Sequence, residues 1–137
     1  MTLVLDASAA LELVMARPER LSVAALLQHY DWVIAPSLFV YEVANALWNY
    51  RRLLKIKLRD LQERLSQAVA LVDELVPASD LHLEALRLAC EIDSPAYDAA
   101  YLTAARRRKA AILSLDRRIT EAAMRLGIQI AGNWLKP

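Results

Sequence analysis

Short runs of β-forming residues alternate with longer amphipathic segments from one end of the chain to the other. Five runs have the length and composition of strands: TLVLD, DWVIAP, LVPA, AAILSL and IQIAG, at residues 2–6, 31–36, 75–78, 110–115 and 128–132. Strands that alternate with helices usually pair in parallel, and the helices cover both faces of the sheet. The pattern therefore predicts an α/β fold with a central parallel sheet.

Between these runs, apolar residues recur at helical spacing. Helices are expected over residues 7–15, 18–30, 36–54, 57–74, 79–92, 95–105 and 117–126. Several residues mark helix ends: Pro18 in a first turn, Ser79 or Asp80 as a cap, Ser94 as a cap before Pro95, and Gly127 as a stop. In the helix over 36–54, Glu42 and Asn45 fall on one polar strip beside an apolar stripe.

The length of 137 residues suits one domain, residues 1–137, which buries about two-thirds of the surface of the unfolded chain. The one cysteine, Cys90, cannot form an intramolecular disulfide, and its helical surroundings predict a reduced interior position. No segment has the apolar length of a membrane helix, and no basic leader precedes Asp6. We expect a soluble, cytoplasmic protein with no membrane partner.

Four acidic residues mark a candidate site: Asp6, Glu42, Asp98 and Asp116. Asp6 and Asp116 each end a predicted strand, at the sheet edge where open parallel α/β folds bind ligands. Glu42 and Asp98 lie in neighbouring predicted helices, and Asp98 has apolar neighbours in the sequence. Four converging carboxylates would supply hard oxygen ligands for Mg²⁺ or Mn²⁺, and such a site hydrolyses phosphodiesters.

Each carboxylate also has an ordinary structural interpretation. Asp6 and Asp116 suit helix N-caps, Asp98 suits the positive end of its helix, and Glu42 suits an exposed helical position. It is the joint pattern that favours a site, because carboxylates gathered out of water repel one another unless a cation neutralises them.

Other chemistry has weaker support in the sequence. The two glycines are too few for a glycine-rich phosphate loop. His29 and His82 have no Cys or His at ligand spacing, so both are interpreted as structural. The aromatic residues are interpreted as core or interface, although Tyr97 and Tyr101 flank Asp98 and are worth testing.

Four segments stand out in order along the chain: VLDASAAL, PSLFVYEVANAL, YDAAYLTAA and ILSLDRRI. They resemble the successive motifs of the PIN-domain ribonucleases, and most closely those of the VapC-type toxins of prokaryotic toxin–antitoxin pairs. The resemblance spans nearly the whole chain. It implies a three-layer α/β/α sandwich around the parallel sheet and endonucleolytic cleavage of RNA. It also implies an Mg²⁺ or Mn²⁺ centre, and it assigns these residues to it: Asp6, Glu42, Asp98 and Asp116 as metal ligands, with Ser8, Asn45 and Ser114 as supporting residues.

Two further expectations come with this resemblance. Some members of the family carry an acidic residue two positions after the last Asp, where this chain has Arg118, so the ligands of a second metal are open. The resemblance also implies a homodimer and a small cognate antitoxin of the VapB type, whose carboxyl segment lies across the active cleft.

The net charge of +1 conceals two basic runs that could bind the RNA backbone beside the acidic residues. The RNA-binding candidates are Arg51, Arg52, Lys55, Arg106, Arg107 and Arg108. The alternative interpretation of both runs is a solvated helix end.

Two other functions are compatible with the same sequence. A metal-dependent phosphatase would use these carboxylates on small phosphate esters and would not need the basic runs. A catalytically silent module with this fold would bind RNA or a protein partner without cutting, and the intact set of four acids argues against it.

Overall fold

The computed structural model describes residues 1–132, which contain a four-stranded parallel sheet in the order β3-β2-β1-β4. The strands are β1 (Thr2–Leu5), β2 (Trp32–Pro36), β3 (Glu74–Val76) and β4 (Ala111–Leu113). In register, Leu3 lies opposite Val33 of β2 and Ala111 of β4. The predicted α/β class and parallel sheet are confirmed.

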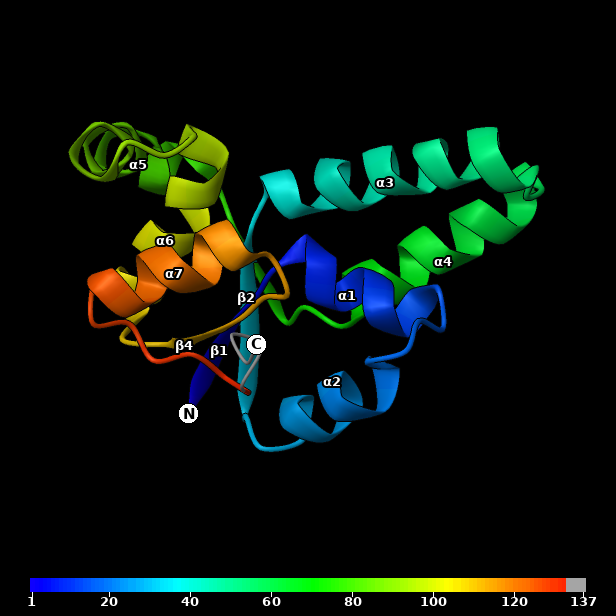
Figure 1. The fold of residues 1–137 in the computed structure, drawn as a ribbon, viewed down its shortest axis with the longest axis horizontal. Helices are drawn as coiled ribbons and strands as arrows, with labels where there is room; N and C mark the ends of the chain where they lie inside the picture. Colours follow the sequence, from blue (N-terminus) through cyan, green and yellow to red (C-terminus); the bar gives the residue numbers. More distant parts are fainter. Residues whose placement is uncertain (133–137) are drawn as a thin grey trace.

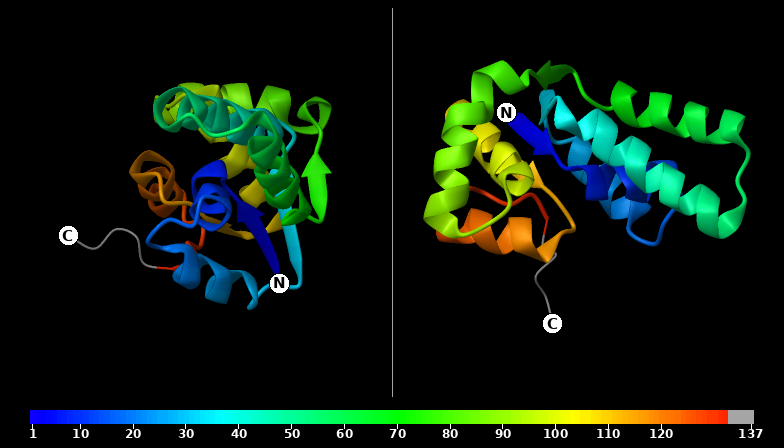
Figure 2. Two further views of the ribbon diagram at one scale, coloured as in Figure 1. Left: turned by 90° about the vertical axis from the view of Figure 1, so that its right-hand side faces the viewer. Right: turned by 90° about the horizontal axis from the view of Figure 1, so that it is seen from above.

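Seven helices occur in the described part of the chain: α1 (Ala7–Val14), α2 (Arg20–Leu27), α3 (Leu38–Leu54), α4 (Leu58–Ala70), α5 (Ala78–Ile92), α6 (Ala96–Arg108) and α7 (Arg117–Arg125). Figure 1 shows α1 and α2 on one side of the sheet and α5, α6 and α7 on the other, which makes a three-layer α/β/α sandwich. Helices α3 and α4 form a hairpin that extends away from the sheet (Figure 2).

The core lies on both faces of the central strand. Leu3, Val4 and Leu5 of β1 are each fully buried, as expected for a parallel strand with helices on both faces. Helix α6 packs against β1, β2 and β4, and its small residues Ala99, Ala104 and Ala105 let it approach the sheet closely. Helix α3 anchors its first turns through buried Phe39 and Val43, while its distal half extends beyond the sheet.

The chain changes direction at β1, because β2 pairs with one edge of this strand and β4 with the other. In open α/β sheets, the carboxyl ends of strands at such a switch point border the ligand-binding crevice. Asp6 follows β1 and Asp116 comes three residues after β4, while α3 begins at the same end of the sheet (Figure 1). The fold therefore brings the sequence-predicted acidic positions to one edge.

Several predicted boundaries are wrong, and contacts with other parts of the chain explain three of them. Residues 128–132 form an isolated bridge, Ile130 with Ile112, in place of a full strand. Helix α4 ends at Ala70 because Asp73 exchanges hydrogen bonds with Val33 of β2. Helix α2 begins at Arg20, two residues after Pro18.

The late start of α2 is explained by the buried carboxylate of Glu12. Glu12 in α1 is 7 % exposed and accepts hydrogen bonds from the Glu19 backbone N–H and from Arg17 Nε. These bonds hold the chain before Arg20 in a turn, so Pro18 belongs to the connection between α1 and α2.

Other local predictions also need correction. Cys90 is exposed, not interior, because it lies on the solvent side of α5. Helices α5 and α6 take Pro77 and Pro95 at their N-cap positions, so Ser79, Asp80 and Ser94 do not cap them. The stop at Gly127 is confirmed, since this glycine has a φ of +71° directly after Leu126.

None of the helices in the described residues has the length and apolar character needed to cross a membrane. Trp134, one of the aromatic residues assigned to core or interface, lies outside the described residues.

Candidate active site

Asp6 is the most deeply placed of the four acids, with 5 % of its surface exposed. It occupies the N-cap position of α1, yet its side chain does not cap that helix. Its Oδ2 accepts hydrogen bonds from Ser8 Oγ at 2.6 Å and from Ser114 Oγ at 2.7 Å. The carboxylate is thus held between the ends of β1 and β4.

The two serines also fix the backbone around Asp6. Ser8 Oγ accepts from the Leu115 N–H at 2.9 Å, and Ser114 Oγ accepts from the Asp116 N–H at 3.0 Å. Each hydroxyl therefore donates to Asp6 and accepts from the β4–α7 connection. The two hydroxyls thus fix the orientation of the Asp6 carboxylate, and proteins orient metal ligands through hydrogen bonds of this kind.

Glu42 lies in the second turn of α3, half-buried, and accepts a hydrogen bond from the Tyr101 hydroxyl at 2.6 Å. Tyr101 comes from α6 and is 1 % exposed. Burial raises the pKa of the Tyr101 phenol, and the nearby charges of Asp6 and Glu42 add to this, so the hydroxyl keeps its proton and acts as a donor. The sequence identifies Tyr101 only as a neighbour of Asp98. The two residues are three positions apart on α6, so they lie next to each other on one surface of the helix.

Asp98 and Asp116 share one cation. Asp98 lies in the first turn of α6 and is 7 % exposed, and its Oδ2 is 3.9 Å from Arg118 Nε. Arg118 Nη2 is 3.4 Å from Asp116 Oδ2. Asp116 also caps α7, because its Oδ1 accepts from the Arg118 N–H at 2.9 Å. The position at which some family members carry an acid thus holds a guanidinium that bridges two acids of this chain.

The four carboxylates act on one another electrostatically. The pKa of Glu42 is raised from 4.5 to about 7, chiefly by burial and further by the charges of Asp6, Asp98 and Asp116, against the lowering effect of the Tyr101 hydroxyl. Burial also raises the pKa of Asp6, with a contribution from Asp116 that opposes the serine hydrogen bonds. The fold thus gathers the four residues that the sequence analysis selected.

The pKa of Asp98 is raised as well. Burial raises its pKa most, Arg118 lowers it, and the charge of Asp116 raises it again. Three acids of the group therefore hold their protons more tightly than they would in water. A cation bound among them would relieve both the burial penalty and the repulsion.

The donor set fits Mg²⁺ or Mn²⁺ in chemistry, since carboxylates and hydroxyls are hard oxygen donors. The side chains as placed in residues 1–132 do not form a group of three or more ligands around a common point. Arg118 already lies within ion-pair distance of two of the acids, so occupation of the site requires this guanidinium to move or to be shared. Arg118 is an exposed side chain, 68 % accessible, and can rotate into solvent.

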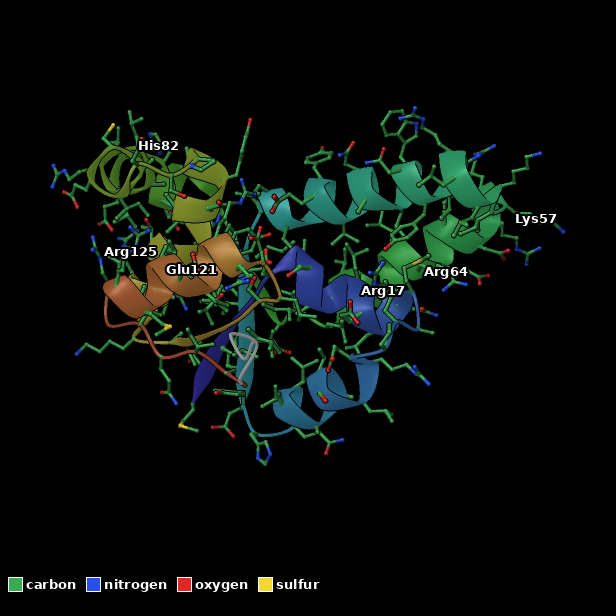
Figure 3. The ribbon with its side chains drawn as sticks, in the orientation of Figure 1. Arg17, Lys57, Arg64, His82, Glu121 and Arg125 are labelled. Atoms are coloured by element: carbon green, nitrogen blue, oxygen red, sulfur yellow. The ribbon has the colours of Figure 1, made fainter. Side chains whose placement is uncertain are left out.

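The remaining site candidates lie farther from the acids. Asn45 is exposed one turn after Glu42. Arg51, Arg52 and Lys55 are at the distal end of α3, with Arg51 roughly 14 Å along the helix axis from Glu42. Figure 3 shows Lys57 at this tip of the α3–α4 hairpin, well away from the start of α3.

The second basic run is at the carboxyl end of α6, with Arg106 roughly 12 Å along the axis from Asp98. Its members differ in their surroundings. Arg107 donates to the Asp80 carbonyl, and Arg108 pairs with Glu74, while Arg106 is exposed. The structure does not bring either run into contact with the carboxylates.

Replacing Tyr101 by Phe is expected to raise the pKa of Glu42 above about 7, because it removes the hydrogen bond that lowers it. Metal binding needs the ionised carboxylate, so metal affinity at pH 7 should fall by about 10- to 100-fold, the usual cost of losing a partner of a metal ligand. Titration calorimetry with Mn²⁺ at pH 7 and 8.5 measures this, and part of the loss should be recovered at the higher pH.

Tyr41→Phe is the matched control, because Tyr41 is an exposed tyrosine beside Glu42. Equal affinity of wild type and Tyr101→Phe at pH 7 would contradict the role.

Comparison with known proteins agrees with the fold. The PIN domain pattern matches residues 3–124. The crystal structure of PAE2754 from Pyrobaculum aerophilum superimposes with a TM-score of 0.70 over 89 % of this chain and 84 % of that chain, at 23 % sequence identity, which shows a shared fold. No curated protein matches the sequence at a significant level. PIN domains are commonly metal-dependent nucleases. The match over most of its length, from β1 to α7, shows that this chain belongs to the PIN-domain family.

Proposed function

We propose that the protein is a metal-dependent endoribonuclease that cuts cellular RNA through Asp6, Glu42, Asp98 and Asp116, and that it acts in the cytoplasm as a VapC-type toxin. The observation that carries the proposal is the electrostatic grouping of these acids at the switch point of the sheet, where burial and mutual repulsion raise the pKa of Asp6, Glu42 and Asp98. Isolated helix caps or surface acids would not be buried together and raise one another's pKa values.

The chemistry follows from the donor set. A bound Mg²⁺ or Mn²⁺ would lower the pKa of an attacking water and shield the charge that builds on the phosphoryl oxygens. Asp6 is held in one orientation by Ser8 and Ser114, and Glu42 by Tyr101. These contacts preorganise the carboxylates, so that little has to be reordered when the cation binds.

Arg118 gives the site a positive charge that does not depend on metal. Its guanidinium lies between Asp98 and Asp116, and it is exposed enough to turn toward a phosphate at the mouth of the site. This supports a centre in which one divalent cation and one guanidinium share the neutralisation of the acids, in place of two metals.

The toxin assignment rests on the order and sequence of the four motifs, which are most similar to those of VapC-type proteins. Its partners would be an antitoxin of the VapB type and a second copy of the chain. Exposed apolar residues on the distal part of α3 and the start of α4 offer surface for such contacts: Trp48, Leu53, Leu54 and Leu58. A short reading frame beside the gene that encodes a DNA-binding segment and a flexible tail would support this pairing.

The test is incubation of total cellular RNA with the purified protein in Mg²⁺ or Mn²⁺. Discrete fragments that disappear with excess EDTA and return when metal is restored are the expected result, and their ends identify the target. A parallel assay with a small phosphate ester separates a ribonuclease from a phosphatase. Intact RNA in the presence of folded, metal-saturated protein would refute the proposed activity.

Neutralising Arg51 and Arg52 together, as Arg→Gln substitutions, is expected to reduce the slope of log affinity against log salt by about 1.4 if both contact phosphates of single-stranded RNA. The reason is that each phosphate contact releases counterions on binding. Filter binding of RNA between 50 and 200 mM salt measures the slope, and Arg20→Gln together with Arg125→Gln is a charge-matched control. An unchanged slope would remove Arg51 and Arg52 from the RNA footprint.

A further inference from the structure

An apolar cavity of about 270 Å³ lies between α5 and the starts of α3 and α6. Leu38, Leu81, Ala85 and Ala100 contribute aliphatic wall, and His82 and Tyr97 contribute rings. Figure 3 shows His82 on α5, on the side of the molecule opposite the tip at Lys57. The mechanism described above uses none of these side chains.

The cavity adjoins the acidic group through two helices. Leu38 lies four residues before Glu42 on the same surface of α3, roughly 6 Å along the axis. On α6, Tyr97 immediately precedes Asp98, and Ala100 precedes Tyr101. The cavity and the acidic group therefore share the first turns of α3 and α6.

Tyr97 is unusual for a ring beside an apolar cavity, because 68 % of its surface is exposed. Its neighbour Tyr101, one turn later, is 1 % exposed and is used by Glu42. A large apolar ring left in water at the rim of a cavity gains most from a flat partner that can stack on it. Nucleobases stack on such rings whatever their sequence.

His82 adds a polar atom to the same cavity. Its Nδ1 is 3.0 Å from the Ala78 carbonyl, and because a carbonyl can only accept, Nδ1 carries the hydrogen of that bond. In the neutral ring, Nε2 is then an acceptor. An amino or imino group on the edge of a base is a donor of matching kind.

A second cavity beside the first carries charged side chains. It shares Leu81 with the first cavity and is lined in addition by Asp80, Arg107 and Arg108, of which Arg107 donates to the Asp80 carbonyl and Arg108 pairs with Glu74. Among the described residues that line the first cavity, none is Lys or Arg. The apolar wall and the rings of the first cavity therefore suit a base and not a phosphate.

We propose that the cavity lined by Tyr97 and His82 holds a base of single-stranded RNA next to the scissile phosphate, with Tyr97 stacking on the ring. This inference rests on the proposed ribonuclease function and adds to it a binding position for one base. Double-stranded RNA cannot present a base to this cavity unless the base leaves the helix.

The experiment uses a single-stranded RNA hexamer that carries 2-aminopurine, whose fluorescence is quenched by stacking on an aromatic ring. Binding is measured with Ca²⁺ in place of Mg²⁺, and the RNA is recovered on a gel afterwards to verify that it is intact. The proteins are wild type, Tyr97→Ala, Tyr97→Phe and Tyr41→Ala. Tyr41 is a matched control, because it is also an exposed tyrosine directly before a site carboxylate but does not line the cavity.

Wild type and Tyr97→Phe should quench the probe with similar affinity, and Tyr97→Ala should bind at least about fivefold more weakly, the loss that corresponds to the lower end of base-stacking energies. Tyr41→Ala should stay within about twofold of wild type. Circular dichroism of each variant verifies its fold.

Three outcomes overturn the proposal: no quenching by folded wild type, an equal loss in Tyr97→Phe and Tyr97→Ala, or an equal loss in Tyr41→Ala. A cavity that takes an apolar peptide side chain instead would give the first of these. Failure of the ribonuclease proposal is separate: it would leave the quenching dependent on Tyr97 while RNA stays uncut in Mg²⁺ and Mn²⁺.

Discussion

Replacing Asp98 by Asn is expected to reduce metal-dependent RNA cleavage by at least about 100-fold, since removal of a ligand should cost no less than removal of a partner of a ligand. The change keeps the shape of the side chain and removes its charge. Single-turnover cleavage of a defined RNA measures the loss, and Asp60→Asn, an exposed aspartate in the first turn of α4, is the matched control.

The same variant should fold at least as well as wild type without metal. Asp98 is 7 % exposed and burial raises its pKa, so neutralising it removes an unfavourable charge, and its ion pair with exposed Arg118 is a small loss. Thermal unfolding separates a dead site from a broken fold. Cleavage by Asp98→Asn at the wild-type rate would show that Asp98 is not a ligand, whatever the stability.

The metal-free protein is expected to lose stability as the pH rises from about 4.5 to about 7, by about 1 to 2 kcal/mol from Glu42, roughly half of the full value of the shift because solvent screens this half-buried group. The pKa of Glu42 is about 7 in the folded protein and ordinary in the unfolded chain. Between these values the folded state carries the extra proton, so raising the pH favours unfolding. Above about pH 7 both states are ionised and the loss is complete. Asp6 and Asp98, whose pKa values are also raised, act in the same direction.

Urea unfolding in EDTA at pH 5, 6, 7 and 8 measures this slope. Glu42→Gln should remove the part that belongs to Glu42, and Glu63→Gln, an exposed glutamate of α4, should not. Saturating Mn²⁺ should flatten the slope, because a cation that binds the ionised carboxylates stabilises the folded state most at high pH. Equal slopes for wild type and Glu42→Gln would contradict the raised pKa.

The layout of the fold could be predicted from the sequence because its strands are short, apolar and separated by clear helical patterns. The residues of β1 and β4 alternate little between apolar and polar, which is typical of strands buried on both faces. The last predicted strand is the exception. Residues 128–132 have strand composition but follow directly on the turn at Gly127, and their recorded pairing is the bridge between Ile130 and Ile112.

Local propensity failed where a distant partner determined the structure. The helical pattern of residues 57–74 runs past Ala70, but hydrogen bonds between Asp73 and Val33 draw its last residues toward the sheet. The helical surroundings of Cys90 predict an interior position, although the helical face that carries it is turned to solvent. Neither the partner of Asp73 nor the orientation of α5 is encoded within a few residues of sequence.

The candidate site was predictable in its acids and not in its other contacts. Strand ends and helix starts locate Asp6 and Asp116 without a structure, because parallel strands end at a common edge. The partner of Tyr101 and the pairing of Arg118 with Asp98 could not be assigned in this way. These contacts depend on how α6 packs beside α3 and α7, which follows from the tertiary fold. The contact of Arg118 with Asp116 is local, because the two residues are two positions apart.

The hydrogen bond from Ser114 to Asp6 joins residues 108 positions apart in the chain. Such a contact cannot form early in synthesis, because β4 must leave the ribosome before it can pair with β1. Asp116, which completes the acidic group, emerges at the same stage. A nascent chain consequently lacks the complete acidic group until β4 and Asp116 have left the ribosome. A protein that cuts RNA would gain from this order of events, since its own message and ribosome stay beyond its reach until then.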